Sequence, residues 1–87
     1  MLRITKQIAQ GVVTLRLEGR LFDAWIDEVR QSLGLETNLQ HVRLDLSGML
    51  HADAAGIQLL KSLRRDGAEI VGANPYFSAL LELPPMP

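Results

Sequence analysis

The hydrophobic period of the chain changes across residues 47–53, and this change constrains the fold more than any other feature. Before this segment, apolar residues alternate with polar ones, as in a strand with one buried face: Val42, Leu44 and Leu46. After it, apolar residues recur at helical spacing: Ile57, Leu59, Leu60 and Leu63. We therefore predict a strand over residues 41–46, a turn through Ser47 and Gly48, and a helix over residues 54–66. A strand that leads into a helix places the helix N-terminus at one edge of a sheet, where α/β proteins usually bind ligands and partners.

The N-terminal residues predict a β-hairpin. Leu2 and Ile4 begin an alternating segment almost at Met1, and a second alternating segment follows Gly11. A short connection between two such segments favours a hairpin with its turn at Gly11. We expect the second strand to end at Gly19.

A first helix is predicted before Gly34, because the apolar residues of this segment lie on one helical face: Phe22, Trp25, Ile26, Val29 and Leu33. Asp23 is the expected N-cap, and Gly34 suits the left-handed residue that often follows a helix. Trp25, the only tryptophan, is expected in the core, because tryptophan is usually well buried. Residues 35–40 are interpreted as a loop.

The C-terminal third of the chain predicts a short strand and a third helix. Gly67 is expected to end the second helix, and residues 69–72 form the apolar strand. Asn74 and Pro75 suit the cap and the first position of the third helix. The residues expected on its buried side are Phe77, Leu80 and Leu81. Two residues are expected to end it: Pro84 and Pro85.

This order of elements, β-β-α-β-α-β-α, predicts an α/β fold with a mixed four-stranded sheet. Right-handed crossovers make strands two, three and four parallel and adjacent, with the first strand antiparallel to the second, so the strand order is 1-2-3-4. Because Arg43 and Asp45 alternate with apolar residues, we expect helices mainly on one face and a second face that is partly open. Residues 1–87 are expected to form a single domain, with residues 83–87 as a tail.

Composition and charge argue against several classes of function. The formal net charge of −1 argues against a general binder of nucleic acids or anionic membranes, because such proteins carry an excess of Lys and Arg. The chain lacks cysteine, so it has no thiolate for a zinc site, a disulfide or catalysis. It has no apolar stretch long enough for a membrane span and no signal-peptide core. We expect a cytoplasmic protein without direct membrane insertion.

No set of residues predicts catalysis or metal binding. His41 and His51 do not share a register that would bring them together, and the His, Asp and Glu residues lack the spacing of known metal motifs. Asp45 and Asp53 flank the predicted turn, and we interpret them as a turn residue and a helix cap rather than a carboxylate pair. We therefore expect no catalytic residue, no metal and no cofactor.

The start of the second helix and its outward face form the candidate site. The carboxylate of Asp53 is expected to accept a hydrogen bond from the amide of Ala55 or Gly56. Glycine costs roughly 1 kcal/mol inside a helix, so Gly56 implies either close packing on the sheet or the approach of a partner or anion. The outward face carries one stripe of residues: Ala54, Gln58, Lys61 and Arg65. This stripe is either a docking surface or plain solvent-facing surface.

Three motifs resemble those of the STAS domain, the family of sulfate transporters and anti-sigma factor antagonists. They are GRL at residues 19–21, DLSG at residues 45–48 and D-x-x-G at residues 53–56. The resemblance covers essentially the whole chain, including the order of strands and helices. In the anti-sigma antagonists, the hydroxyl residue after the aspartate is phosphorylated by a partner kinase that is also the anti-sigma factor. Here the equivalent residue is Ala54, and the next is Ala55.

The resemblance implies a non-catalytic protein-binding module that acts without phosphorylation. The implied partner is a serine-kinase-type anti-sigma factor or the ATPase of a lipid-transporting ABC system, which some stand-alone STAS proteins serve. The expected partner-binding residues are Asp53, Ala54, Gly56, Gln58, Lys61 and Arg65. A second hypothesis is a small-ligand sensor that binds an anion or nucleotide at the N-terminus of the second helix. The carboxylate of Asp53 opposes this hypothesis, because it would repel an anion and occupy the same amides.

Overall fold

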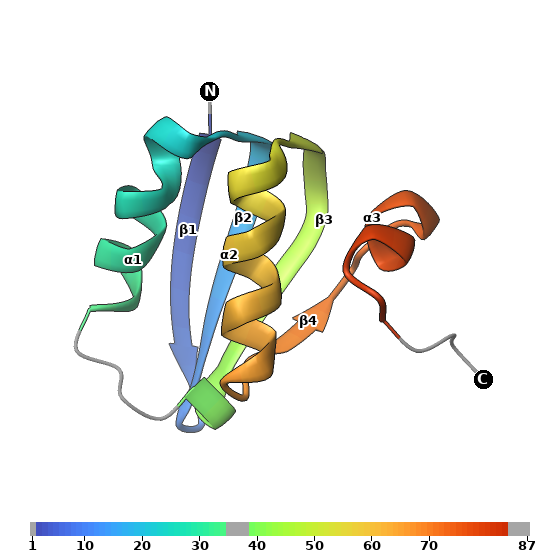
Figure 1. The fold of residues 1–87 in the computed structure, drawn as a ribbon. Helices are drawn as coiled ribbons and strands as arrows, with labels where there is room; N and C mark the ends of the chain where they lie inside the picture. The colour runs from blue at the N-terminus through green and yellow to red at the C-terminus, as the bar shows by residue number, and fades with distance from the viewer. Residues whose placement is uncertain (1, 35–38, 84–87) are drawn as a thin grey trace.

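A β-hairpin is followed by alternating α-helices and β-strands in the computed structural model, which describes residues 2–34 and 39–83 (Figure 1). The strands are β1 (Leu2–Ala9), β2 (Val12–Leu21), β3 (Val42–Ala52) and β4 (Glu69–Val71). The α-helices are α1 (Ile26–Leu33), α2 (Ala54–Arg65) and α3 (Pro75–Leu80). Two short 3-10 helices, η1 (Asp23–Trp25) and η2 (Leu39–His41), precede α1 and β3. The order of strands and α-helices is the predicted one.

The strands form one mixed sheet in the predicted order β1-β2-β3-β4. β1 pairs antiparallel with β2, whereas β2, β3 and β4 are parallel neighbours. The hairpin turn uses Gln10 and Gly11, whose φ angles of 53° and 78° are both positive. Two-residue turns with positive φ at both positions match the twist of the flanking strands. The predicted hairpin and the predicted parallel pairings are therefore confirmed.

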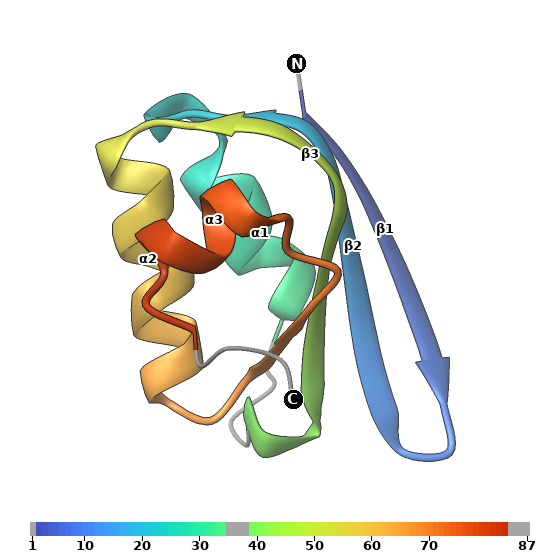
Figure 2. The ribbon, with the colours of Figure 1, turned by 90° about the vertical axis from the view of Figure 1, so that its right-hand side faces the viewer.

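All three α-helices lie on one side of the sheet (Figure 2). The core fills the space between the helices and the sheet. Its fully buried side chains come from both layers and include Leu15, Leu17, Leu21, Leu44, Leu46, Leu60, Phe77 and Leu81. The opposite face of the sheet is polar, and Thr5, Thr14 and Arg16 line a shallow hollow of about 400 Å³ there. The expectation of one covered face and one open face is confirmed.

The strands β2 and β3 are both longer than predicted at the end that leads to α2. β3 continues through Ser47 and Gly48 to Ala52, and β2 continues through Gly19 to Leu21. The predicted turn is wrong because the two strands extend their pairing over these residues. The continued ladder satisfies backbone groups that a turn would leave exposed.

A β-bulge bends this extended pair of strands. Gly19 pairs with Met49 and Arg20 pairs with His51, so Leu50 has no residue opposite it. An extra residue of this kind increases the local twist and redirects side chains. An earlier register shift, where Arg16 pairs with Asp45 but Glu18 pairs with Gly48, makes Met49 the next buried residue after Leu46. Leu50 therefore points to the other face and is 74% exposed.

The first α-helix begins later than predicted, and the side chain of Asp23 does not cap it. Residues 23–25 form η1, and α1 begins at Ile26 without a side-chain cap. Asp23 instead donates its backbone N–H to the carboxylate of Asp53. Trp25 packs against the core but is only partly buried, so its predicted core position is only partly correct.

The third helix begins as predicted, but its buried side is narrower. The side chain of Asn74 accepts a 2.8 Å hydrogen bond from the backbone N–H of Phe77, and Pro75 is the first helical residue. Phe77 and Leu81 are buried, whereas Leu80 is 37% exposed and does not belong to the core.

Two predicted features lie outside the described residues. One is most of the loop over residues 35–40, of which the structure describes only residues 39 and 40, within η2. The other is the tail from residue 84 onward, which includes the two prolines expected to end the third helix. α3 already ends at Leu80.

Candidate functional site

Asp53 joins three elements at the carboxyl end of the parallel strands, two through its carboxylate and one through its backbone. Its Oδ1 atom accepts a 2.8 Å hydrogen bond from the backbone N–H of Gly56, in the first turn of α2. Its Oδ2 atom accepts a 3.0 Å hydrogen bond from the backbone N–H of Asp23, at the start of η1. The backbone N–H of Asp53 donates to the carbonyl oxygen of Leu21, at the end of β2, over 3.1 Å. The predicted cap is confirmed, and its second role, as a link to η1, was not predicted.

Gly56 allows α2 to pack directly on the end of β2. A Cβ atom at this position would lie 2.7 Å from the carbonyl oxygen of Leu21 and 3.3 Å from the Cβ of Ala52. A carbonyl oxygen cannot move aside as a flexible side chain can, so only glycine fits without a shift of backbone. Of the two explanations for this glycine, close packing on the sheet is therefore the one that the structure supports. Gly56 is buried, so the expectation that it contacts a partner directly is wrong.

Several exposed residues lie near Asp53 in the sequence. Ala54 is exposed at the first position of α2, so the residue after the aspartate is accessible but carries only a methyl group. The exposed His51 ring contacts the edge of Phe22, with ring centroids 5.6 Å apart. Leu50 adds an exposed apolar side chain. Sequence reasoning missed Leu50, because no local pattern marks the register shift before Met49 that leaves Leu50 on the exposed face.

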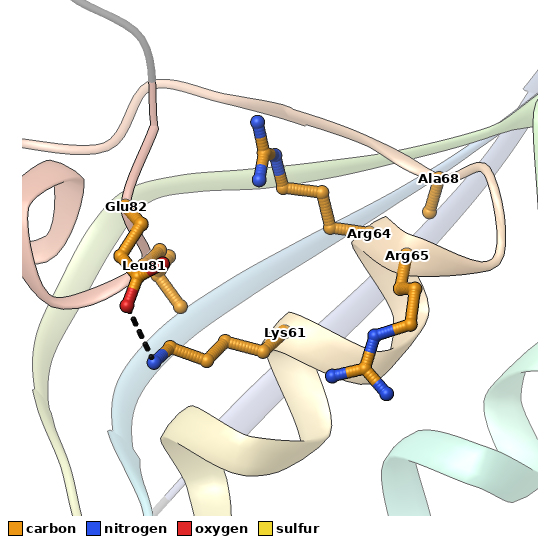
Figure 3. A pocket seen from close by; sticks show the side chains of 6 residues that line it. All are labelled: Lys61, Arg64, Arg65, Ala68, Leu81 and Glu82. Carbon is orange, nitrogen blue, oxygen red and sulfur yellow. Dashed lines mark hydrogen bonds and ion pairs between the residues drawn. The ribbon is translucent and has the colours of Figure 1, made fainter.

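The outward stripe of α2 is polar near its middle and basic toward its C-terminus. Gln58 and Arg65 are exposed, and Lys61 is half-buried, with its Nζ atom 3.5 Å from the Oε1 atom of Glu82. Figure 3 shows this contact in a hollow of about 460 Å³ that also includes Arg64. The guanidinium groups of Arg64 and Arg65 extend in different directions, and only Lys61 reaches Glu82 (Figure 3). The basic side chains therefore do not converge on one small-ligand position.

The two aspartates that flanked the predicted turn lie far apart. Asp45 lies within the part of β3 that pairs with β4, and Asp53 follows the last residue of β3. Eight residues of extended strand span roughly 26 Å, so the two carboxylates cannot act as a pair. The Oδ1 atom of Asp45 instead accepts a 2.9 Å hydrogen bond from the backbone N–H of Ser47. Hydrogen bonds from the backbone and side chain of Ser47, with a smaller effect of the Arg16 charge, hold the pKa of Asp45 below its usual value.

Within residues 2–34 and 39–83, no helix is long and apolar enough to cross a membrane. In the same part of the chain, no three His, Asp or Glu side chains gather as ligands for a metal ion.

The sheet order, the single layer of helices and the aspartate-capped helix after β3 together define an α/β domain of the STAS type. The family model of the STAS domain matches residues 3–82. The chain therefore belongs to the STAS domain family.

Solved structures with similar folds include two anti-sigma factor antagonists. The anti-sigma factor antagonist SpoIIAA, in its unphosphorylated form, superimposes with a TM-score of 0.69 at 14% sequence identity, over 98% of this chain and 84% of the SpoIIAA chain. The STAS domain of an anti-sigma factor antagonist from Rhodobacter sphaeroides superimposes with a TM-score of 0.59 at 25% identity, over 82% of this chain and 86% of the other. No curated protein sequence matches the chain significantly.

Proposed function

We propose that this STAS domain is a non-catalytic, cytoplasmic protein-binding module that resembles the anti-sigma factor antagonists and acts without phosphorylation. The observation that carries the proposal is the geometry at Asp53. Both carboxylate oxygens bind backbone amides of the domain itself, and the exposed methyl of Ala54 lies directly beside them. Such an arrangement fixes the position of a small surface and uses the Asp53 carboxylate for structure.

The absence of a hydroxyl group supports independence from phosphorylation. In the anti-sigma antagonists, a phosphate on the residue after the aspartate adds about two negative charges at the docking surface and disrupts it. Neither Ala54 nor Ala55 can accept a phosphate. The surface at Ala54 is therefore permanently in the uncharged form, and binding is constitutive wherever the partner is present.

The proposed docking surface comprises Asp53, Ala54, Gln58, Lys61 and Arg65, together with Leu50 and His51 on its apolar side. Gly56 supports this surface from within, through its packing against Leu21. The partner is a serine-kinase-type anti-sigma factor or the ATPase of a lipid-transporting ABC system. The anion-sensor hypothesis is less consistent with this geometry, because the carboxylate of Asp53 already occupies the Gly56 amide at the N-terminus of α2.

A capture experiment with a matched control tests the proposal. The tagged domain and its Ala54→Glu variant are used as baits in native lysate, and the bound proteins are identified by mass spectrometry. Ala79→Glu adds the same charge at an exposed position on α3 and serves as the control. We expect the wild-type domain and the control to capture a kinase-like anti-sigma factor or a transporter ATPase, and Ala54→Glu to lose it. Equal capture by all three baits would place the interface elsewhere.

A further inference from the structure

A groove lies between α1 and α2 on the helical side of the domain, with a volume of about 380 Å³. Ile26 from α1 and Ala55 and Leu59 from α2 give it an apolar lining. Arg30 comes from α1 and Arg65 from α2, so each of the two helices contributes one guanidinium group. The groove thus combines a small apolar lining with two positive charges that are 35 positions apart in the sequence.

Neither guanidinium group forms an ion pair with a described acidic side chain. The ion pairs within residues 2–34 and 39–83 involve Arg16, Arg43 and Lys61, and neither Arg30 nor Arg65 takes part in one. Among the described residues, no Asp or Glu lines the groove. The chain as a whole has a net charge of −1, so the positive charge of the groove is opposite in sign to the net charge of the protein.

The groove is continuous with the docking surface proposed above. Ala55 follows Ala54 directly, and Gln58 and Arg65 belong both to the outward stripe of α2 and to the groove lining. A partner that covers Ala54 would therefore have the groove within its immediate reach.

We propose that this groove binds an acidic, amphipathic segment of the protein partner. One apolar side chain of the segment packs on Ile26, Ala55 and Leu59, and carboxylates on either side of it pair with Arg30 and Arg65. The apolar lining favours a peptide over a nucleic acid, because phosphate and sugar are contacted mainly by basic and polar groups. The inference rests on the proposed function, because it extends the same docking surface onto α1.

A peptide selection tests the chemistry of the groove without knowledge of the partner. The probe is a phage-displayed library of random dodecapeptides, selected on the immobilised full chain. We expect enriched peptides to carry Asp or Glu on both sides of an apolar residue. The affinity of the strongest peptide, measured by fluorescence anisotropy, should fall about tenfold in Arg30→Glu and in Arg65→Glu, because each reversal places like charges together. Lys6→Glu makes the same charge change on β1, away from the groove, and should leave the affinity unchanged.

Several outcomes would overturn the inference. These are enrichment of basic or uncharged peptides, no enrichment at all, or an acidic peptide whose affinity is the same in both arginine variants. Thermal denaturation checks that each variant is folded. If a Glu variant melts without cooperativity, Arg30→Gln and Arg65→Gln replace it, and a smaller loss of affinity is expected from the removal of one charge.

The same capture experiment, repeated with variants of the groove, tests this inference separately from the proposed function. Loss of the partner in Ala54→Glu, with full binding in Arg30→Glu, would keep the proposed function and overturn the role of the groove, because Arg30 belongs to the groove and not to the docking surface. Full binding in both variants would contradict both.

Discussion

The carboxylate of Asp53 accepts a hydrogen bond from the backbone N–H of Asp23, which lies 30 residues earlier in the chain, over a distance of 3.0 Å. The same carboxylate caps α2 through Gly56. One side chain therefore fixes the start of η1 relative to the start of α2. These two hydrogen bonds hold the backbone beside Ala54 in one position relative to η1 and α2.

Removal of the Asp53 carboxylate should destabilise the domain more than the loss of an ordinary helix cap. Asp53→Ala is expected to lower the free energy of unfolding by roughly 2–3 kcal/mol, because it removes a cap and a second charge-assisted hydrogen bond. Asp53→Asn keeps one acceptor oxygen, so its free energy of unfolding should lie between those of the wild type and Asp53→Ala. Asn74→Ala, which removes the single cap of α3, is the control, with an expected loss of about 1 kcal/mol. Urea denaturation measures all three, and equal losses for Asp53→Ala and Asn74→Ala would contradict the link to Asp23.

Gly56→Ala should destabilise the domain although alanine is the better helix former. The added methyl would lie 2.7 Å from the carbonyl oxygen of Leu21, and overpacking of this kind typically costs 1–3 kcal/mol, about as much as or more than the roughly 1 kcal/mol gained in helix propensity. Gln58→Ala, on the exposed side of the same helix, should leave stability unchanged within about 0.5 kcal/mol. Chemical denaturation of the two variants and the wild type measures these changes in the free energy of unfolding. A stabilised Gly56→Ala would mean that α2 does not pack closely on β2.

Ala54→Glu should lose partner binding while the fold stays as stable as before. A carboxylate in the first turn of a helix interacts favourably with the helix dipole, which contributes typically 0.3–1 kcal/mol. We therefore expect the melting temperature of Ala54→Glu to equal or slightly exceed that of the wild type. A large drop in melting temperature would show that the capture result reports unfolding rather than a blocked interface.

Ala54→Ser tests whether the partner is a kinase. If the partner is a serine-kinase-type anti-sigma factor, the new hydroxyl should become phosphorylated by the purified partner and ATP, and the phosphorylated form should lose affinity. Wild type should gain no phosphate under the same conditions. Intact-protein mass spectrometry measures the transfer, and a binding assay measures its effect. Phosphate incorporated into the wild-type chain would contradict independence from phosphorylation.

The hydrogen bonds from Ser47 to Asp45 should make stability depend on pH in the acid range. The pKa of Asp45 lies below its ordinary value of 3.8 in the folded state, so the unfolded chain binds a proton more readily than the folded one. The stabilisation is therefore fully present above that ordinary value and is lost as the pH falls through the lower folded pKa. Asp45→Asn should remove this pH-dependent part, so the difference in unfolding free energy from wild type should shrink as the solution is acidified. Urea titrations between neutral and strongly acid pH measure it; a constant difference would contradict the lowered pKa.

Periodicity and capping residues were enough to predict most of the fold. The apolar positions after Asp53 and the cap itself placed α2 within one residue of its observed end at Arg65. Alternation in the N-terminal segments and the turn at Gly11 predicted the hairpin, and the handedness of crossovers predicted the sheet order. These features depend on local sequence or on general rules of chain connection, so a single sequence contains them.

The remaining features depend on contacts between distant parts of the chain. Ser47 and Gly48 are turn-forming residues by type, but pairing with β2 keeps them in a strand. The exposure of Leu50 follows from a register shift in that pairing. The link from Asp53 to Asp23 and the shared groove of Arg30 and Arg65 each join residues about 30 positions or more apart, which no local pattern encodes.

Because β4 is short, only part of β3 has a neighbouring strand on both sides. β4 pairs only with residues Arg43, Leu44 and Asp45, so among the described residues the rest of β3, up to Ala52, has β2 as its sole strand neighbour. Backbone amides held by one neighbour open more readily than those enclosed by two. The part of β3 that leads to Asp53 is thus expected to exchange its amide hydrogens faster than the part that pairs with β4. Local opening would then begin beside the proposed docking surface, and a bound partner would slow it there first.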